Sequence, residues 1–128
     1  MPTHILDASA VIALMAREPG AERVRELVRS GSAGISTVNA SEVASKLVAR
    51  GAKPKAAEYQ CRSMGLEFIA VDAAIAFAAA ALLPLTSALG LSLGDRICLA
   101  TAATCGVPAV TADRAWAKLT GIAVEVIR

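Results

Sequence analysis

The sequence predicts an α/β protein, a three-layer α/β/α sandwich around a mostly parallel five-stranded sheet. Short strand-like segments alternate with helical segments along the whole chain, which is typical of a parallel sheet covered by helices. Apolar residues make up 55% of the chain and charged residues 19%, as in a compact globular protein. The length of 128 residues fits a single domain, expected over residues 1–128.

Local patterns give the order of the elements. Short apolar or alternating runs between turn residues predict strands, at about 3–6, 34–36, 67–71, 107–110 and 122–127. Apolar residues at helical spacing predict helices, at about 8–17, 21–30, 38–50, 54–64, 73–89, 95–105 and from 113 onward. Thr37, Asp72 and Asp95 are expected to cap the helices that follow them, and Pro84 to interrupt the Ala-rich helix.

The composition narrows the range of functions. A net charge of +2 lacks the strong basic excess of proteins that bind duplex nucleic acid. The three cysteines, Cys61, Cys98 and Cys105, form no CxxC pair, so we expect core packing in a reducing, cytoplasmic compartment. The longest apolar run, 73–85, is shorter than the ~20 residues that a membrane span needs, so no membrane partner is expected.

Four carboxylates fall where an expected helix leaves, or has just left, one edge of the expected sheet: Asp7, Glu42, Asp95 and Asp113. Ligands of open α/β sheets bind at that edge, so the four acids are expected to form one site. Two such charges 4 Å apart repel by about 4 kcal/mol at an effective dielectric constant of 20. Divalent cations relieve this repulsion, and oxygen ligands without histidine favour Mg²⁺ or Mn²⁺.

Simpler explanations exist for each acid alone. Asp7, Asp95 and Asp113 each suit a helix N-cap, and Glu42 suits a solvated helix face beside Lys46. Asp72 is also an expected N-cap but belongs to no motif, and we expect it to be purely structural. The only histidine, His4, lies inside the first expected strand, where a structural role is expected.

Four segments together resemble the PIN domain, and within it the VapC-type ribonuclease toxins of bacterial toxin–antitoxin pairs: Ile5–Ala10, Ile35–Val43, Leu91–Ala100 and Val110–Trp116. The resemblance implies that Asp7, Glu42, Asp95 and Asp113 form the catalytic, metal-binding site. It implies that Ser9 and Thr111 orient carboxylates or water. For both hydroxyls, a bond to backbone or a turn is an equally good explanation.

The same resemblance implies a Mg²⁺- or Mn²⁺-dependent endoribonuclease that leaves a 5′-phosphate and a 3′-hydroxyl. Arg96 and Arg114 flank two of the acids and are candidates for RNA phosphate contacts, with charge balance on exposed turns as the alternative. The implied partners are a small VapB-like antitoxin and a second copy of the chain. A groove beside the helices at 21–30 and 54–64 is the expected antitoxin site.

Two other function classes remain open from the sequence. A PIN-like binding module with weak catalysis would mainly hold a protein partner, although the complete acid set disfavours it. Haloacid-dehalogenase-like phosphatases also place an Asp at the end of the first strand, but they need a second Asp two residues later, where this chain has Ser9. Response-regulator receivers need an acidic pair before that strand's Asp, which is absent.

Overall fold

A fully parallel five-stranded sheet lies at the centre of the computed structural model, which describes residues 1–128. The strand order is β3-β2-β1-β4-β5. The strands are β1 His4–Leu6, β2 Ala33–Ser36, β3 Glu67–Ile69, β4 Ala109–Thr111 and β5 Val124–Val126. Each lies within a few residues of its expected place, and the α/β fold class is confirmed.

Seven α-helices and two short 3₁₀ helices connect the strands. The α-helices are α1 Ala8–Ala16, α2 Ala21–Arg29, α3 Thr37–Ala49, α4 Pro54–Arg62, α5 Ala73–Ala81, α6 Leu83–Thr86 and α7 Leu93–Cys105. The 3₁₀ helices are η1 Ser87–Leu89 and η2 Arg114–Lys118. Pro84 ends the Ala-rich helix and starts α6, as expected, because proline cannot continue the preceding hydrogen-bond ladder.

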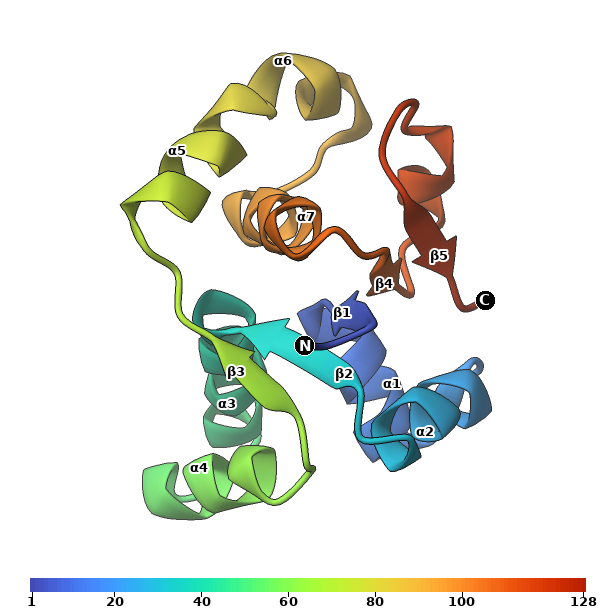
Figure 1. Ribbon diagram of the computed structural model, residues 1–128. Helices are drawn as coiled ribbons and strands as arrows, with labels where there is room; N and C mark the ends of the chain where they lie inside the picture. Colours follow the sequence, from blue (N-terminus) through green and yellow to red (C-terminus); the bar gives the residue numbers. More distant parts are fainter.

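The helices form a layer on each face of the sheet (Figure 1). Below the sheet in this view lie α1 and α3, with α2 packed on α1 and α4 packed on α3. Above it lies α7, which contacts β1, β2 and β4 and is covered in turn by α5. No helix combines the length and apolar character that crossing a membrane requires.

Neighbouring residues of β1 lie in two different hydrophobic cores, one on each face of the sheet. Leu6 packs with Val11, Val24 and Ile35 on the α1 side of the sheet. Ile5 packs instead with Cys98 and Trp116 on the α7 side, as strand alternation requires. Since both faces of β1 are buried, the central strand is held from both sides, and the residue that follows it has little freedom to move.

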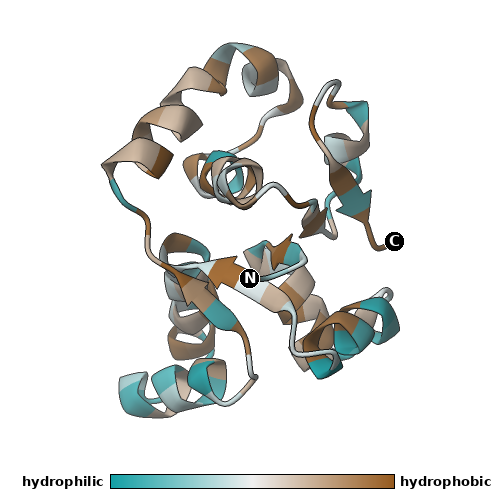
Figure 2. Ribbon diagram, in the orientation of Figure 1, coloured by the Kyte–Doolittle hydropathy of each residue, from teal (hydrophilic) through white to brown (hydrophobic).

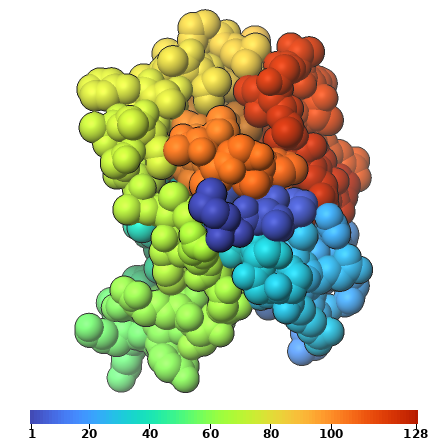
Figure 3. Space-filling view, viewed as in Figure 1, coloured from blue at the N-terminus to red at the C-terminus, as the bar shows by residue number.

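The helix α7 is enclosed. Figure 3 shows it in orange between the yellow α5–α6 segment and the red C-terminal segment, beside the blue N-terminus. In contrast, α5 and α6 expose much of their apolar surface: Phe77 is 76% exposed, and Leu83, Leu85 and the neighbouring Leu93 are exposed as well. Figure 2 shows α5 without the hydrophilic stretches that α2 and α4 carry.

Two predicted helix caps were wrong. The N-cap of α3 is Ser36, whose hydroxyl accepts the Asn39 N–H, while Thr37 is the first helical residue. The N-cap of α7 is Ser92, and Asp95 lies three residues inside the helix. In both cases a serine upstream of the expected cap takes the position, because its short hydroxyl reaches the third backbone N–H equally well.

The topology singles out one part of the sheet edge. From central β1 the chain builds outward through β2 and β3, then crosses to the other side of β1 to form β4 and β5. The strand order therefore reverses between β1 and β4, and the crevice at the carboxyl ends of these two strands is the usual ligand position in such sheets. Asp7 directly follows β1, and Asp113 follows β4 by two residues.

Candidate active site

Asp7 is the most constrained of the four predicted acids. It caps α1 and is only 3% exposed. Its Oδ1 accepts the Ala10 N–H at 2.8 Å, and the Ser9 hydroxyl lies 2.7 and 2.9 Å from its two oxygens. Its Oδ2 accepts the Thr111 hydroxyl at 2.6 Å. Both carboxylate oxygens are therefore engaged, from two separate segments of the chain.

The turn after β4 completes this arrangement. The backbone N–H of Ala112 donates to the Ser9 hydroxyl at 2.9 Å, and that of Asp113 donates to the Thr111 hydroxyl at 3.0 Å. Each hydroxyl thus accepts one bond and donates another toward Asp7. Ser9 and Thr111, the two side chains that the resemblance suggested as supports, therefore both hydrogen-bond to the Asp7 carboxylate.

Burial of Asp7 has an electrostatic consequence. The pKa of its carboxyl is raised from 3.8 to about 6, mainly because burial removes the group from water and to a smaller extent because of the nearby charge of Asp95. The hydrogen bonds from Thr111, Ala10 and Ser9 act in the opposite direction but only in part. Four donor contacts are therefore insufficient to stabilise the charged form fully at this position.

Glu42 is held by a neighbour on its own helix. It is half-buried, and its Oε1 accepts the side-chain N–H of Asn39 at 2.6 Å. Its Oε2 has no hydrogen bond. The alternative partner, Lys46, forms no ion pair with it. A solvated i,i+4 pair therefore does not explain this acid.

Asp95 belongs to a capping box at the start of α7. Its Oδ2 accepts the Ser92 N–H at 2.9 Å, while its own N–H donates to the Ser92 hydroxyl at 3.2 Å. This reciprocal arrangement fixes the side chain in the first turn of the helix. Its Oδ1 makes no hydrogen bond, so one oxygen of this half-buried carboxylate stays free.

Asp113 caps η2 and is exposed. Its Oδ1 accepts the Ala115 N–H at 2.9 Å, as the sequence predicted for an N-cap, and its Oδ2 has no hydrogen bond. Its backbone N–H, through Thr111, ties its position to that of Asp7. Asp113 is thus anchored to the same network, although the residue itself is exposed.

The charges of three of the four acids act on one residue of α7. Burial raises the pKa of the Cys98 thiol well above its usual value, and the charges of Asp7, Asp95 and Glu42 add to that effect. Asp113 is not among these charges. No three His, Cys, Asp or Glu side chains are grouped closely enough to hold a metal ion unaided.

Basic side chains pair with some acids of this protein and leave others unpaired. Five glutamates on the outer surface, Glu18, Glu22, Glu26, Glu58 and Glu125, are all in ion pairs. None of the four predicted site acids has such a partner, and neither have Glu67 and Asp72 outside the site. The sheet edge therefore carries negative charge that no side chain of this protein neutralises, which suits a cation bound through oxygen atoms.

The two arginines suggested for phosphate contacts lie in different environments. Arg96 is half-buried and donates to the carbonyl of Ala79 at 3.1 Å, so it joins α7 to α5. Its Nε is buried without a partner. Arg114 is exposed and donates to the backbone carbonyl of Arg128 at 3.2 Å. Of the two, only Arg114 is on the open surface.

Sequence reasoning missed Asn39. This residue is 1% exposed and donates to both Glu42 and the carbonyl of Gly94, at 2.6 and 3.1 Å. The signal was present, because residues three apart on a helix face each other and Asn39 precedes Glu42 by three. Its contact with Gly94 joins segments 55 positions apart and has no signature in the sequence.

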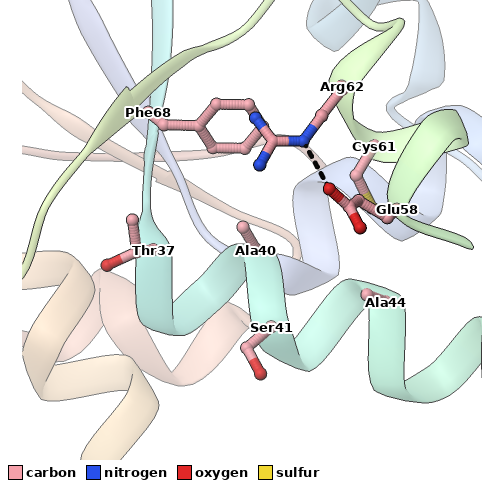
Figure 4. A pocket seen from close by; sticks show the side chains of 8 residues that line it. All are labelled: Thr37, Ala40, Ser41, Ala44, Glu58, Cys61, Arg62 and Phe68. Atoms are coloured by element: carbon pink, nitrogen blue, oxygen red, sulfur yellow. Dashed lines mark hydrogen bonds and ion pairs between the residues drawn. The ribbon is translucent and has the colours of Figure 1, made fainter. Parts of the chain in front are cut away.

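The expected groove was misplaced. A hollow of about 310 Å³ lies between α3 and α4, with Phe68 of β3 at one side, and not between α2 and α4 (Figure 4). Arg62 lies over the Phe68 ring at 5.7 Å and pairs with Glu58 at 2.9 Å. The reason is that α2 turns its apolar face onto α1, and α4 turns its own onto α3.

Burial of Asp7 predicts a pH-dependent stability. Because folding raises its pKa, the contribution of this group is fully present below pH ~4 and is lost as the pH rises through about 6. In the presence of a chelator, the free energy of unfolding of the wild type should fall by up to about 3 kcal/mol relative to that of Asp7→Asn between pH 4 and 7.5. Denaturant unfolding of both proteins measures this. A difference that stays constant over that range contradicts the assigned burial cost.

Comparison with known proteins agrees with this architecture. A family model of the PIN domain matches residues 4–122. No curated protein sequence matches the chain. A chain of DNA-bound VapBC from Salmonella typhimurium superposes with a TM-score of 0.74 at 18% identity, covering 100% of both chains. A chain of VapBC2 from Rickettsia felis, bound to a promoter DNA fragment, gives 0.73 at 16% identity, covering 96% of this chain and 97% of that one.

A third structure, a toxin–antitoxin complex from Klebsiella pneumoniae, gives a TM-score of 0.71 at 23% identity and covers 98% of each chain. At these identities the structures establish the fold, and the family model extends from β1 nearly to β5. The resemblance seen in the four sequence segments is thereby confirmed, and this chain belongs to the PIN-domain family.

Proposed function

We propose that this protein is a metal-dependent endoribonuclease that acts as the toxin of a VapBC-like toxin–antitoxin pair. One observation supports the proposal: the charges of Asp7, Glu42 and Asp95 all act on Cys98 of α7, Asp7 follows β1 where strand order reverses, and none of the three acids has a basic partner. The buried Asp7 carboxyl, whose pKa is raised to about 6, costs stability when it is charged, which favours a catalytic over a structural role.

The donor set fits Mg²⁺ or Mn²⁺. Carboxylate oxygens are the ligands these hard cations prefer, and Mg²⁺ is usually held by one or two carboxylates with water and substrate phosphate completing its shell. That mode agrees with the lack of a closed three-ligand cluster. We assign Asp7 and Asp95 as direct ligands, Glu42 as a ligand or a holder of water, and Asp113 to a second position.

When bound, a divalent cation activates water and stabilises charge on the leaving oxygen of a phosphodiester. The chain itself supplies orientation. Ser9 and Thr111 fix the Asp7 carboxylate, and Ser92 fixes that of Asp95. The free Oε2 of Glu42 is the atom that we assign to orienting the attacking water. Hydrolysis of RNA then leaves a 5′-phosphate and a 3′-hydroxyl, as the family resemblance implies.

Single-stranded or loop RNA is the proposed substrate. The slight net charge of +2 suits a substrate whose reacting phosphate is held mainly at the metal site. Exposed Arg114, next to Asp113, is the better placed of the two arginines to contact a phosphate. Arg96, engaged with the carbonyl of Ala79, is assigned a structural role instead.

The partners are proposed from the fold and two surface features. The similar structures are VapBC and toxin–antitoxin complexes, which supports a small antitoxin, and the hollow between α3 and α4 is a suitable place for its helix. The exposed apolar residues of α5 and α6 support a homodimer. We expect a short reading frame immediately upstream of the gene; an isolated gene would argue against the antitoxin.

A PIN-like module that only holds a partner is the alternative. The presence of all four acids argues against it. Such a module would either not bind Mn²⁺ or bind it equally well after the substitution Asp95→Asn. Titration with Mn²⁺ therefore separates the two functions without any knowledge of the RNA target.

The catalytic assignment predicts a clear mutational pattern. With Mg²⁺ or Mn²⁺, wild type should cut single-stranded RNA, and Asp7→Asn or Asp95→Asn should lower the rate at least about 100-fold, since each removes a carboxylate from the metal site. The matched control is Asp72→Asn, which changes an exposed Asp at another helix N-cap and should keep full activity. Equal activity in all four proteins rules the assignment out.

A further inference from the structure

The side chain of Asn39 has only one consistent orientation. Its Nδ2 faces two groups that can only accept hydrogen bonds, the Glu42 carboxylate at 2.6 Å and the Gly94 carbonyl at 3.1 Å. Its Oδ1 accepts the Ser36 hydroxyl at 2.7 Å. A reversed amide would place Oδ1 against two acceptors, at a large cost in a residue that is 1% exposed.

These contacts connect two of the acids through the backbone. Asn39 and Glu42 lie on α3, whereas Gly94 lies in the first turn of α7, directly before Asp95. The amide therefore holds one carboxylate through its side chain and the other through the adjacent peptide. It is the only side chain that hydrogen-bonds to both of these segments.

Gly94 supplies the complementary surface. A Cβ at this position would lie 2.5 Å from Oε1 and 2.7 Å from Oε2 of Glu42. Its φ is not in the left-handed region, so the glycine is required for space and not for backbone conformation. The Glu42 carboxylate thus rests directly against the α7 backbone, and the Asn39 amide hydrogen-bonds to both of them.

We infer that Asn39 is a positioning residue: it fixes the Glu42 carboxylate at a set place relative to Asp95, with Gly94 as the surface against which Glu42 rests. The inference rests on the proposed function, because it assigns this geometry to metal binding and water orientation. Helix capping does not account for the side chain, since the Ser36 hydroxyl caps α3 through the Asn39 backbone N–H.

The test is a double-mutant cycle with Mn²⁺ affinity and RNA cleavage as readouts. Asn39→Leu keeps the approximate volume and removes the hydrogen bonds, and Glu42→Ala removes the group through which Asn39 acts. The matched control is Thr101→Val, which also removes a hydrogen bond from a fully buried side chain, to the Ile97 carbonyl within α7, without touching the acids.

Asn39→Leu should lower Mn²⁺ affinity and cleavage about 10- to 100-fold, the usual effect of losing a partner that orients a ligand. In the Glu42→Ala background the same change should cost no more than about threefold, because the two residues act as a unit. Thr101→Val should leave both readouts near wild type. An equal loss in both backgrounds, or no loss in either, overturns the positioning role.

A second variant keeps the test decisive if Asn39→Leu does not fold. Gly94→Ala should keep or raise stability, since alanine favours helix, yet should weaken Mn²⁺ binding about tenfold by displacing Glu42. Unchanged affinity in Gly94→Ala contradicts the inference. Wild type that neither binds Mn²⁺ nor cuts RNA overturns the proposed function as well, whereas an active wild type with unaffected variants overturns only the role of Asn39.

Discussion

The hydrogen bonding of the buried Asp7 carboxylate is the interaction on which the rest of the site depends. Ser9 and Ala10 donate to it from α1, and Thr111 donates from the end of β4. These bonds tie together the central strand, its following helix and the neighbouring strand at the point of topological reversal. A buried charge without such donors would cost several kcal/mol. The pKa of about 6 shows that the donors offset this cost only in part.

The protein's own side chains do not fully neutralise the carboxylates at the sheet edge, and this favours a bound cation. The ion pairs lie on outer surfaces, such as Arg23 with Glu125 and Arg62 with Glu58, while the acids at the sheet edge have none. Arg96, one residue from Asp95, turns toward α5 instead. A positive charge that neutralises these carboxylates would therefore come from outside the chain. A divalent cation matches their oxygen ligands.

Features that depend on neighbouring residues could be predicted from the sequence, whereas contacts between distant segments could not. The fold class, the order of elements and the position of Asp7 after β1 depend on local periodicity and turn residues, and the sequence predicted them. The cap of α7 was wrong by three residues because Ser92 and Asp95 both suit a helix start. The contact of Asn39 with Gly94 depends on how α3 packs against α7, which no local pattern encodes.

The most direct test of a cation site at Asp7 is the titration of its own carboxyl, followed by NMR with and without Mg²⁺. Cation and proton compete for the same oxygens, so the account predicts that the pKa, about 6 in chelator, falls progressively as Mg²⁺ is added. A pKa of Asp7 that does not change at saturating Mg²⁺ or Mn²⁺ would contradict the central claim.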